Sequence, residues 1–299
     1  WTAPDFHRTS LRSAGESGPP TTVLHYGLSS REPTGVHEMN DHRPRRQVSV
    51  IGIGAGGVDL LTAEASAALR ELDAVIVISK GEERDHLLAP RRAVLAAHAS
   101  PTVRVLEVVD PVRANDVAYR EAVGEWHRER ARRVGEAVAA TGPDERIGIL
   151  VWGDPSLYDS ALRLLEMVEE QADIALEVTV IPGITSIQLL AAAHRIVLHR
   201  VGGSFLVTTG RRLAEGEGDG FDDVVVMLNS EPAFTRFIGR GYDLYWGAYL
   251  GDENQVLRSG ELDEIADEVT ALRAELTERH GWMFDIYLLR RRLDRSPGG

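Results

Sequence analysis

Short β-branched runs alternate with longer segments of helical period between residue 47 and about residue 200. The runs lie at 48–53, 74–78, 103–108, 147–152 and 176–181. The segments between them lie at 62–72, 85–99, 115–140 and 161–170. Strands that are each followed by a crossover helix form parallel sheets with helices on both faces. This order predicts a doubly wound α/β domain over residues 47–200.

The pattern changes after residue 200. Strand-like runs follow at 205–208, 224–228, 244–249 and 283–289. They are accompanied by only two clear helices, at 231–238 and 263–280. Fewer crossover helices per strand indicate a mixed sheet. We therefore predict a second α/β domain over residues 201–293, a domain boundary near residue 200, and a tail at 294–299.

Residues 1–46 have the composition of a disordered extension. They contain five of the thirteen prolines and show no sustained period of a helix or a strand. Met39 lies shortly before the first predicted strand and is a candidate start of translation. We therefore expect the folded part to begin near residue 47.

Composition excludes several classes of function. The formal net charge of -13 disfavours a nucleic-acid partner, because such proteins need a basic footprint. The absence of cysteine excludes disulfides, thiolate nucleophiles and cysteine-ligated metals, and we predict no metal site. No apolar run reaches spanning length, and the first residues lack the apolar core of a secretory signal. We therefore expect a cytoplasmic protein with no membrane partner.

A glycine-rich loop follows the first strand. Residues 52–57 match the G-x-G-x-x-G pattern of dinucleotide-binding loops. In that motif the helix starts at the glycines, whereas residues 58–61 here precede the helix cap Thr62. Lys80 also lies near the position where an acid would bind the ribose. A nicotinamide enzyme is therefore only an alternative. We favour a glycine-rich loop that contacts another ligand over a turn whose only role is to pack against its neighbours.

Two further turns connect strands to helices, at residues 151–160 (V-W-G-D-P-S-L-Y-D-S) and 181–186 (I-P-G-I-T-S). Ligands of open α/β sheets bind outside the carboxyl ends of the strands, so these turns predict one small-molecule site. Asp154, Ser156, Thr185 and Ser186 also suit helix capping, which is the simpler interpretation of each turn taken alone.

The glycine-rich loop and the two turns, in this order, resemble the tetrapyrrole methylases. Their motifs are G-x-G-P-G-D-P, G-D-P and V-P-G-[VI]-[ST]-[SA]. The resemblance covers residues 47–293 and includes further matching segments at 80–83, 126–127, 208–213, 245–251 and 285–291. It implies two α/β domains with the cofactor cleft between them (a class III methyltransferase), S-adenosylmethionine as cofactor, a tetrapyrrole substrate and a homodimer. Residues 54–58 here read G-A-G-G-V, so both prolines and the aspartate of the first motif are absent.

The resemblance also implies which residues contact S-adenosylmethionine. Carried over position by position, they are Ala55, Trp152, Gly153, Asp154, Leu157, Thr185, Ser186, Met227 and Gly251. Ala55 replaces a proline of the family. Met227 ends a strand, where a thioether suits packing on adenine, although a core methionine is equally compatible with that position.

The implied reaction moves a methyl group onto a ring carbon of the macrocycle. Alignment alone can supply about 7–11 kcal/mol, so this step needs no strong base. In the members with the further segments, an acetyl group also leaves as acetate, which requires a base and an oxyanion donor. Candidates for this step are Asp159, Tyr158, His127 and the pair Glu82 and Glu83, although Asp159 also suits a helix cap and His127 a structural role.

The substrate carries many carboxylates, so we expect a locally basic site. Arg211 and Arg212 follow a predicted strand end and, with Lys80, are the candidate substrate contacts. Three alternatives stay open besides the nicotinamide enzyme: a methylase of the same fold acting on another corrinoid precursor, one acting on a macromolecule, and a binding module without turnover.

Overall fold

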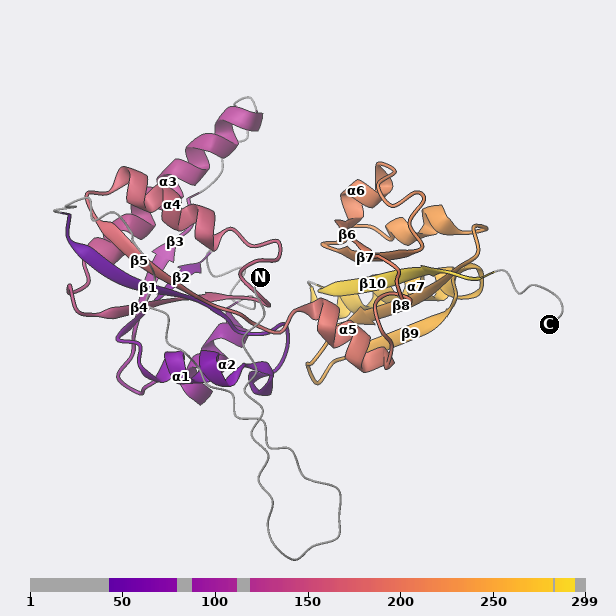
Figure 1. Cartoon of the computed structure of the whole chain (residues 1–299), viewed down its shortest axis with the longest axis horizontal. Coiled ribbons are helices and arrows are strands. Elements are labelled where there is room, and N and C mark those ends of the chain that lie inside the picture. Colours follow the sequence, from indigo (N-terminus) through magenta and orange to yellow (C-terminus); the bar gives the residue numbers. More distant parts are fainter. Residues whose placement is uncertain (1–42, 80–87, 112–118, 282, 294–299) are drawn as a thin grey trace, which may run out of the picture. The chain divides into compact units, whose positions relative to one another are not determined.

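The computed structural model describes residues 43–79, 88–111, 119–281 and 283–293, which contain two five-stranded sheets (Figure 1). Of the predicted extension over residues 1–46, only 43–46 are described, and Arg45 and Arg46 already belong to the first strand. The predicted tail at 294–299 lies outside the described residues.

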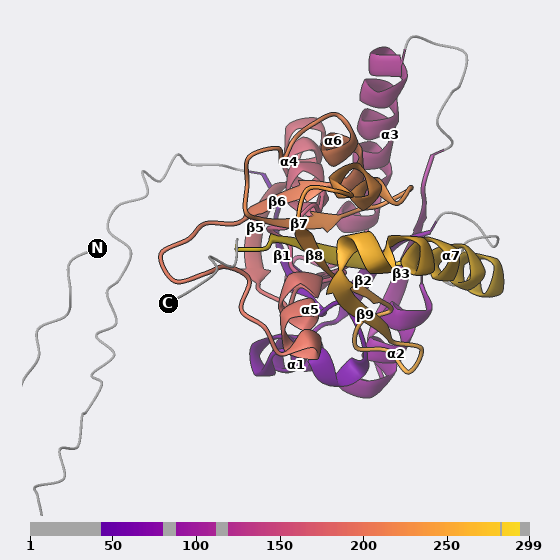
Figure 2. The ribbon, with the colours of Figure 1, turned by 90° about the vertical axis from the view of Figure 1, so that its right-hand side faces the viewer.

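The first sheet is parallel throughout, with the strand order β3-β2-β4-β1-β5. Its strands are β1 Arg45–Gly52, β2 Ala74–Ser79, β3 Arg104–Val109, β4 Arg146–Val151 and β5 Ala175–Ile181. Its helices are α1 Ala63–Arg70, α2 Ala89–His98, α3 Tyr119–Ala139 and α4 Ala161–Gln171. In both views α1 and α2 cover one face and α3 and α4 the other (Figure 1, Figure 2). The predicted doubly wound parallel sheet is confirmed.

Each face of this sheet has its own apolar core. Val48 and Val50 of β1 pack with the residues under α3 and α4. Ile51 and Ile53 pack with those over α1 and α2. Full burial of one such side chain contributes about 1.5–3 kcal/mol. Strands β2 and β4 are buried on both faces and are apolar almost throughout, whereas the edge strands β3 and β5 are largely exposed.

The second sheet is mixed, as predicted, with the order β6-β7-β10-β8-β9. Its strands are β6 Leu206–Thr209, β7 Asp223–Met227, β8 Tyr242–Ala248, β9 Val256–Glu261 and β10 Asp285–Arg291. Only β6 and β7 pair in parallel, and the other pairs are antiparallel. Around it lie α5 Ser186–His194, α6 Gly210–Ala214 and α7 Leu262–His280. The apolar residues of α6 and α7 share one core, and those of α5 another.

Three elements differ from the prediction. Strand β9 was not predicted, because it is a partly exposed edge strand with only two apolar residues. Helix α6 was not predicted either, because five residues are too few to show a helical period. The expected helix at 231–238 is instead a 3₁₀ turn, η3 Ala233–Phe237, which begins after Pro232.

Helix α5 packs on the second sheet, since Ile187 and Leu190 share a core with Val225 and Leu288. The domain boundary near residue 200 stays a prediction. This packing favours a boundary nearer residue 185.

Candidate functional site

The three predicted turns lie side by side at one edge of the first sheet. Strands β4 and β5 both pair with β1, so their carboxyl ends are neighbours. The first two turns are joined directly, because Gly153 N–H donates to the Gly54 carbonyl (2.8 Å) and Gly54 N–H to the Gly153 carbonyl (3.3 Å). Since β1 leads to α1 on one face and β4 to α4 on the other, this junction is a topological switch point.

Glycines allow the backbones of these turns to touch. A Cβ on Gly183 would lie 2.1 Å from the Gly153 carbonyl oxygen, and one on Gly52 would lie 2.6 Å from the Gly183 nitrogen. Gly153 differs from both. Its φ of +74° suits glycine, and a Cβ there would meet no atom within 4 Å. The space beside Gly153 is therefore open to a ligand that approaches the backbone.

Asp154 ties the second turn to the third. Its Oδ2 accepts from Gly183 N–H (2.8 Å), and its Oδ1 accepts from the amide (2.8 Å) and the hydroxyl (2.5 Å) of Ser156. Partial burial on its own would raise the pKa of Asp154. The hydrogen bonds from Ser156 and Gly183 outweigh burial and lower that pKa below its usual value. Both carboxylate oxygens of Asp154 accept hydrogen bonds from the protein. Asp154 therefore holds the second and third turns in their positions.

The third turn ends in a complete capping box. Gln188 N–H donates to Thr185 Oγ1 (3.4 Å), while the Thr185 amide and hydroxyl both donate to Gln188 Oε1 (2.7 Å each). The capping role considered for Thr185 is therefore present. Ser186 is the first residue of α5 and is half-buried.

The second sheet contributes a matching edge. The strand directions place the carboxyl ends of β6, β7 and β8 together. Met227 ends β7 and is half-buried, and Gly251 lies just beyond β8. The Gly251 carbonyl accepts from Gly57 N–H (2.8 Å), so the glycine-rich loop, with buried Ala55, is hydrogen-bonded to this edge.

Three residues in this region have strained backbone. Tyr158, Leu228 and Tyr249 have φ of +53°, +53° and +50°, and follow β4, β7 and β8. Among the described residues the other non-glycine residue with positive φ is Arg195, which ends α5. Such strain clusters at ligand-binding sites. Sequence reasoning did not predict the backbone conformation at these positions, because nothing in a tyrosine or a leucine indicates a left-handed conformation.

Two aromatic rings also meet near the second turn. Trp152 stacks on Phe284, with ring centroids 5.6 Å apart and planes at 16°. Phe284 is 45% exposed and lies in the strand predicted at 283–289, but nothing in the sequence indicated that its ring would meet Trp152. Leu157, the remaining predicted cofactor contact, is half-buried and packs with the core that includes Met227 and α5.

The described residues proposed to remove the acetyl group lie in different surroundings. Tyr158 OH donates to the Val207 carbonyl (3.4 Å), whereas Asp159 Oδ1 accepts from the first amide of α4, Ala161 N–H (2.5 Å). The N-cap of α4 is Ser160, so Asp159 binds this helix end from one position further out. His127 lies on α3 and lines a cavity beside α4. Within the described ranges no hydrogen bond joins any two of these three side chains. Glu82, Glu83 and Lys80 lie outside the described residues.

Tyr158 keeps its proton at neutral pH. Partial burial raises its pKa above the usual value, the negative charge of Glu217 adds to this, and Arg212 opposes it. A neutral phenol is a hydrogen-bond donor.

The two candidate arginines have different environments. Both are exposed on α6. Arg212 donates to Glu217 (Nε to Oε2 2.8 Å, Nη2 to Oε1 2.7 Å), so its charge is balanced. Arg211 forms no side-chain hydrogen bond or ion pair with any residue that the structure describes. It is therefore the better candidate for an anionic ligand.

A dinucleotide site is not favoured. Helix α1 begins at Ala63, and Thr62 Oγ1 accepts from Ala65 N–H (3.0 Å). The 3₁₀ turn η1 Val58–Leu60 separates the glycines from this helix, so a pyrophosphate at the loop would not lie on the helix N-terminus. Across the described residues, no group of three histidine, aspartate or glutamate side chains could hold a metal ion.

Comparison with known proteins identifies the family. The family model for Tetrapyrrole (Corrin/Porphyrin) Methylases matches residues 47–266. A precorrin-6A synthase (deacetylating) from Sinorhizobium sp is 38% identical over 252 residues, which cover 83% of this chain and 97% of that relative.

Solved structures support the same family. The cobalamin synthesis related protein CobF from Corynebacterium diphtheriae superposes with a TM-score of 0.73 at 38% identity, over 83% of this chain and 98% of that one. A uroporphyrin-III C-methyl transferase from Thermus thermophilus, complexed with S-adenyl homocysteine, shares the fold at 21% identity, with a TM-score of 0.51 over 82% of this chain and 97% of that one. The resemblance found in the motifs is thereby confirmed, and this chain belongs to the tetrapyrrole (corrin/porphyrin) methylases, which use S-adenosylmethionine.

Proposed function

We propose that this chain methylates precorrin-5 and releases its acetyl group as acetate, forming precorrin-6A in aerobic cobalamin biosynthesis. The observation that carries the proposal is the 38% identity to a precorrin-6A synthase over 97% of that relative, which spans both sheets. The family's other members act on different tetrapyrroles, so the family alone would support only a methyl transfer.

The residues present fit S-adenosylmethionine. The open space at Gly153 lets a ligand reach the backbone at the switch point, as ligands of such sheets do. The N-terminus of α5 suits the carboxylate of the methionine part. Met227, half-buried at the end of β7, offers a soft surface for adenine. We propose that Ala55, Trp152, Leu157, Ser186 and Gly251 complete this set, while Asp154 and Thr185 hold the turns in place.

S-adenosylmethionine supplies an activated methyl group when it is bound. Transfer of this methyl group to a ring carbon of the macrocycle would break its bond to sulfur and would leave S-adenosylhomocysteine. The protein contributes alignment to this step, worth about 7–11 kcal/mol when the geometry is good.

Release of the acetyl group needs water to add to the acyl carbon. The bond from that carbon to the macrocycle then breaks, the macrocycle keeps the electron pair, the proton of the water is taken up by a base, and acetate leaves. Tyr158 is suited to donate to the developing oxyanion, because its raised pKa keeps the phenol protonated. His127 has a lowered pKa, caused first by burial and then by Arg130 and Arg163, so it is neutral at pH 7 and able to accept a proton. Asp159 already binds an amide, which makes it the weakest of the three candidates.

The test is turnover of precorrin-5 with S-adenosylmethionine labelled with ¹³C in its methyl group. We expect a product with one labelled methyl, and one acetate released per product. A labelled product without acetate would favour a methylase of another corrinoid precursor. No product, while S-adenosylhomocysteine still binds in calorimetry, would favour a binding module without turnover.

We also propose that the protein acts on this small molecule as a homodimer in the cytoplasm, without a nucleic-acid partner. The acidic net charge of -13 supports the last point. None of the described helices is long and apolar enough to cross a membrane. Light scattering on purified protein, with and without added RNA, tests the dimer and the absence of RNA binding together.

A further inference from the structure

A cavity of about 310 Å³ lies between α3 and α4, outside the turns described above. His127, Arg128 and Arg130 line it from α3, and Arg163 lines it from α4. Ser160, the last residue of the second turn, also lines it. The turn that begins with Trp152 and Gly153 therefore ends at this cavity.

The cavity is basic although the whole chain is acidic. Three arginines line it, and no carboxylate does. Arg130 pairs with Asp110 (3.4 Å). In the part of the chain that the structure describes, the side chains of Arg128 and Arg163 form neither a hydrogen bond nor an ion pair. Two exposed guanidinium groups thus face the cavity with their charges unbalanced.

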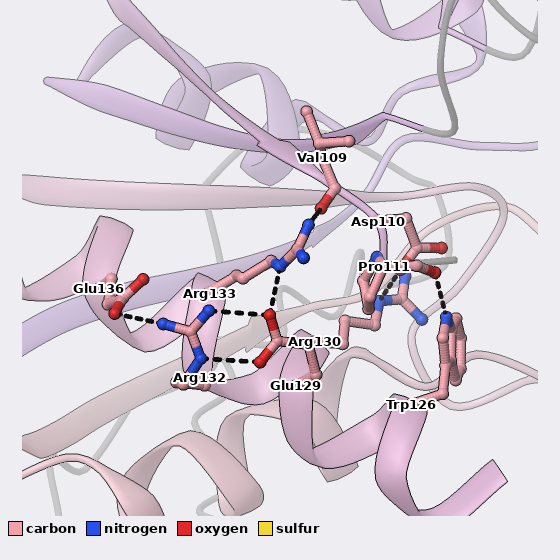
Figure 3. A network of polar contacts seen from close by, with 9 residues as sticks. All are labelled: Val109, Asp110, Pro111, Trp126, Glu129, Arg130, Arg132, Arg133 and Glu136. Carbon is pink, nitrogen blue, oxygen red and sulfur yellow. Dashed lines mark hydrogen bonds and ion pairs between the residues drawn. The ribbon is translucent and has the colours of Figure 1, made fainter. Parts of the chain in front are cut away.

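The carboxylate of Glu129, the residue after Arg128, is already paired with other arginines of α3 (Figure 3). Glu129 accepts from Arg132 (2.7 and 2.8 Å) and from Arg133 (2.7 Å). Hydrogen bonds from Arg132 and then Arg133 lower the pKa of Glu129 to about 2. Glu129 therefore stays ionised and paired on its own side of α3.

The α3 wall of the cavity is fixed to the loop after β3 (Figure 3). Trp126 Nε1 donates to the Pro111 carbonyl (2.7 Å), and Arg133 donates to the Val109 carbonyl (2.9 Å). The guanidinium of Arg130 lies 5.0 Å from the centre of the Trp126 ring. These contacts fix the position of α3 beside the cavity, which reduces the ordering cost of binding a ligand there.

The pKa of His127 reflects the burial of its ring and the charges around the cavity. Burial lowers its pKa first, the positive charges of Arg130 and Arg163 lower it further, and Asp110 opposes them. The neutral imidazole can donate one hydrogen bond to a ligand without adding charge. The amino end of α4 adds a partial positive charge on the other side.

We propose that this cavity binds a carboxylate side chain of the tetrapyrrole, held by Arg163 and Arg128 and by a hydrogen bond from His127. The inference rests on the proposed function, since a polycarboxylate macrocycle must lie at the second turn for a side chain to reach Ser160. Ligand pockets range over about 300–1,000 Å³, so this volume suits a substituent and not the ring system. Arginine suits carboxylates through its two-pronged geometry.

Steady-state kinetics test the proposal. We expect Arg163→Gln to raise the KM for precorrin-5 about tenfold and to leave the affinity for S-adenosylhomocysteine unchanged. Arg163→Lys keeps the charge and should restore part of the loss. The control is Arg70→Gln, which removes the same charge from an exposed position on α1, across the sheet. An unchanged KM in Arg163→Gln would overturn the proposal.

A second measurement does not depend on turnover. Sodium propionate, titrated into the wild-type protein, should shift the ring signals of His127 in NMR spectra and raise its pKa. The shift should be lost in Arg163→Gln and kept in Arg70→Gln. If propionate shifts His127 but precorrin-5 is not turned over, the carboxylate site stands and the proposed function fails. If precorrin-5 is turned over but neither His127 nor the KM responds, the carboxylate site is wrong.

Discussion

The two sheets build their ligand-facing edges in different ways. In the first sheet all five strands are parallel, so the carboxyl ends of β1, β4 and β5 meet because of the topology alone. Glycines then let the turns touch. In the mixed second sheet, the ends of β7 and β8 are separated by the start of β10. The turns there carry Leu228 and Tyr249 in left-handed conformations. Close contact between glycines shapes the first edge, where Tyr158 is the described non-glycine residue with positive φ, whereas two such residues, Leu228 and Tyr249, follow the strands of the second edge.

The largest effect is expected at Gly183, where the glycines of two turns touch. In Gly183→Ala the new methyl would lie 2.1 Å from the Gly153 carbonyl, so the second and third turns must separate. We expect a loss of about 3 kcal/mol in the free energy of unfolding. Binding of S-adenosylhomocysteine should fall below detection. Thermal unfolding and calorimetry measure the two effects.

Gly202→Ala is the matched control for this change. Gly202 has a φ of +72° and open space around its Cβ position. Only the strain of a left-handed alanine is expected, about 1 kcal/mol, with cofactor binding unchanged. Equal losses in the two variants would show that the turns do not depend on contact between glycines.

Asp154→Asn tests the hydrogen bonds that tie two turns together. One amide oxygen cannot replace both carboxylate oxygens, so a donor on Gly183 or Ser156 loses its partner. We expect a loss of about 1 kcal/mol in unfolding free energy, since solvent screens this half-buried group. Cofactor affinity should fall about fivefold, because the turns shift. Chemical denaturation and calorimetry are the measurements.

The pH dependence follows from the lowered pKa of Asp154. A carboxylate whose pKa is lower in the folded state stabilises that state above the unfolded pKa of about 3.9. The contribution is lost as the pH falls through the folded-state value. The stability difference between wild type and Asp154→Asn should therefore shrink below about pH 4. A difference that stayed constant down to pH 2 would contradict this role of Asp154.

The same contrast explains what the sequence could predict. Topology and glycine content are visible in a sequence, so the parallel sheet, the three turns and their convergence follow from it. Strain is not visible, and the left-handed conformations of Tyr158, Leu228 and Tyr249 were not predicted. The sequence also did not show which arginine pairs with which acid. Arg211 and Arg212 are neighbours of equal type, and only the position of Glu217 distinguishes them. The cavity between α3 and α4 depends on which residues of two helices face each other, which spacing alone does not determine.

Leu228→Gly tests whether the left-handed backbone of the second sheet serves a ligand. The side chain is 61% exposed, so little packing is lost when the strain is released. We expect the free energy of unfolding to rise by about 0.5–1 kcal/mol. Affinity for S-adenosylhomocysteine should fall about threefold, because Leu228 adjoins Met227 at the proposed adenine surface.

Arg195→Gly provides the control, since Arg195 has a similar φ of +56° at the end of α5. It should gain the same stability without any change in binding. A gain in both variants with no change in affinity would mean that the strain at Leu228 serves no ligand.

The smallest effect is expected on α6, where two neighbouring arginines differ only in their partners. Arg211→Ala should raise the KM for the macrocycle about threefold and leave cofactor affinity alone, because an exposed charge contributes little to binding. Arg212→Ala should change the KM less, since its guanidinium already pairs with Glu217 and is not free to bind an anion. The difference should disappear in 0.5 M salt, which screens charges at the surface. If Arg212→Ala has the larger effect, Arg212 must leave Glu217 to bind the substrate, and α6 would then take part in binding by rearranging its own ion pair.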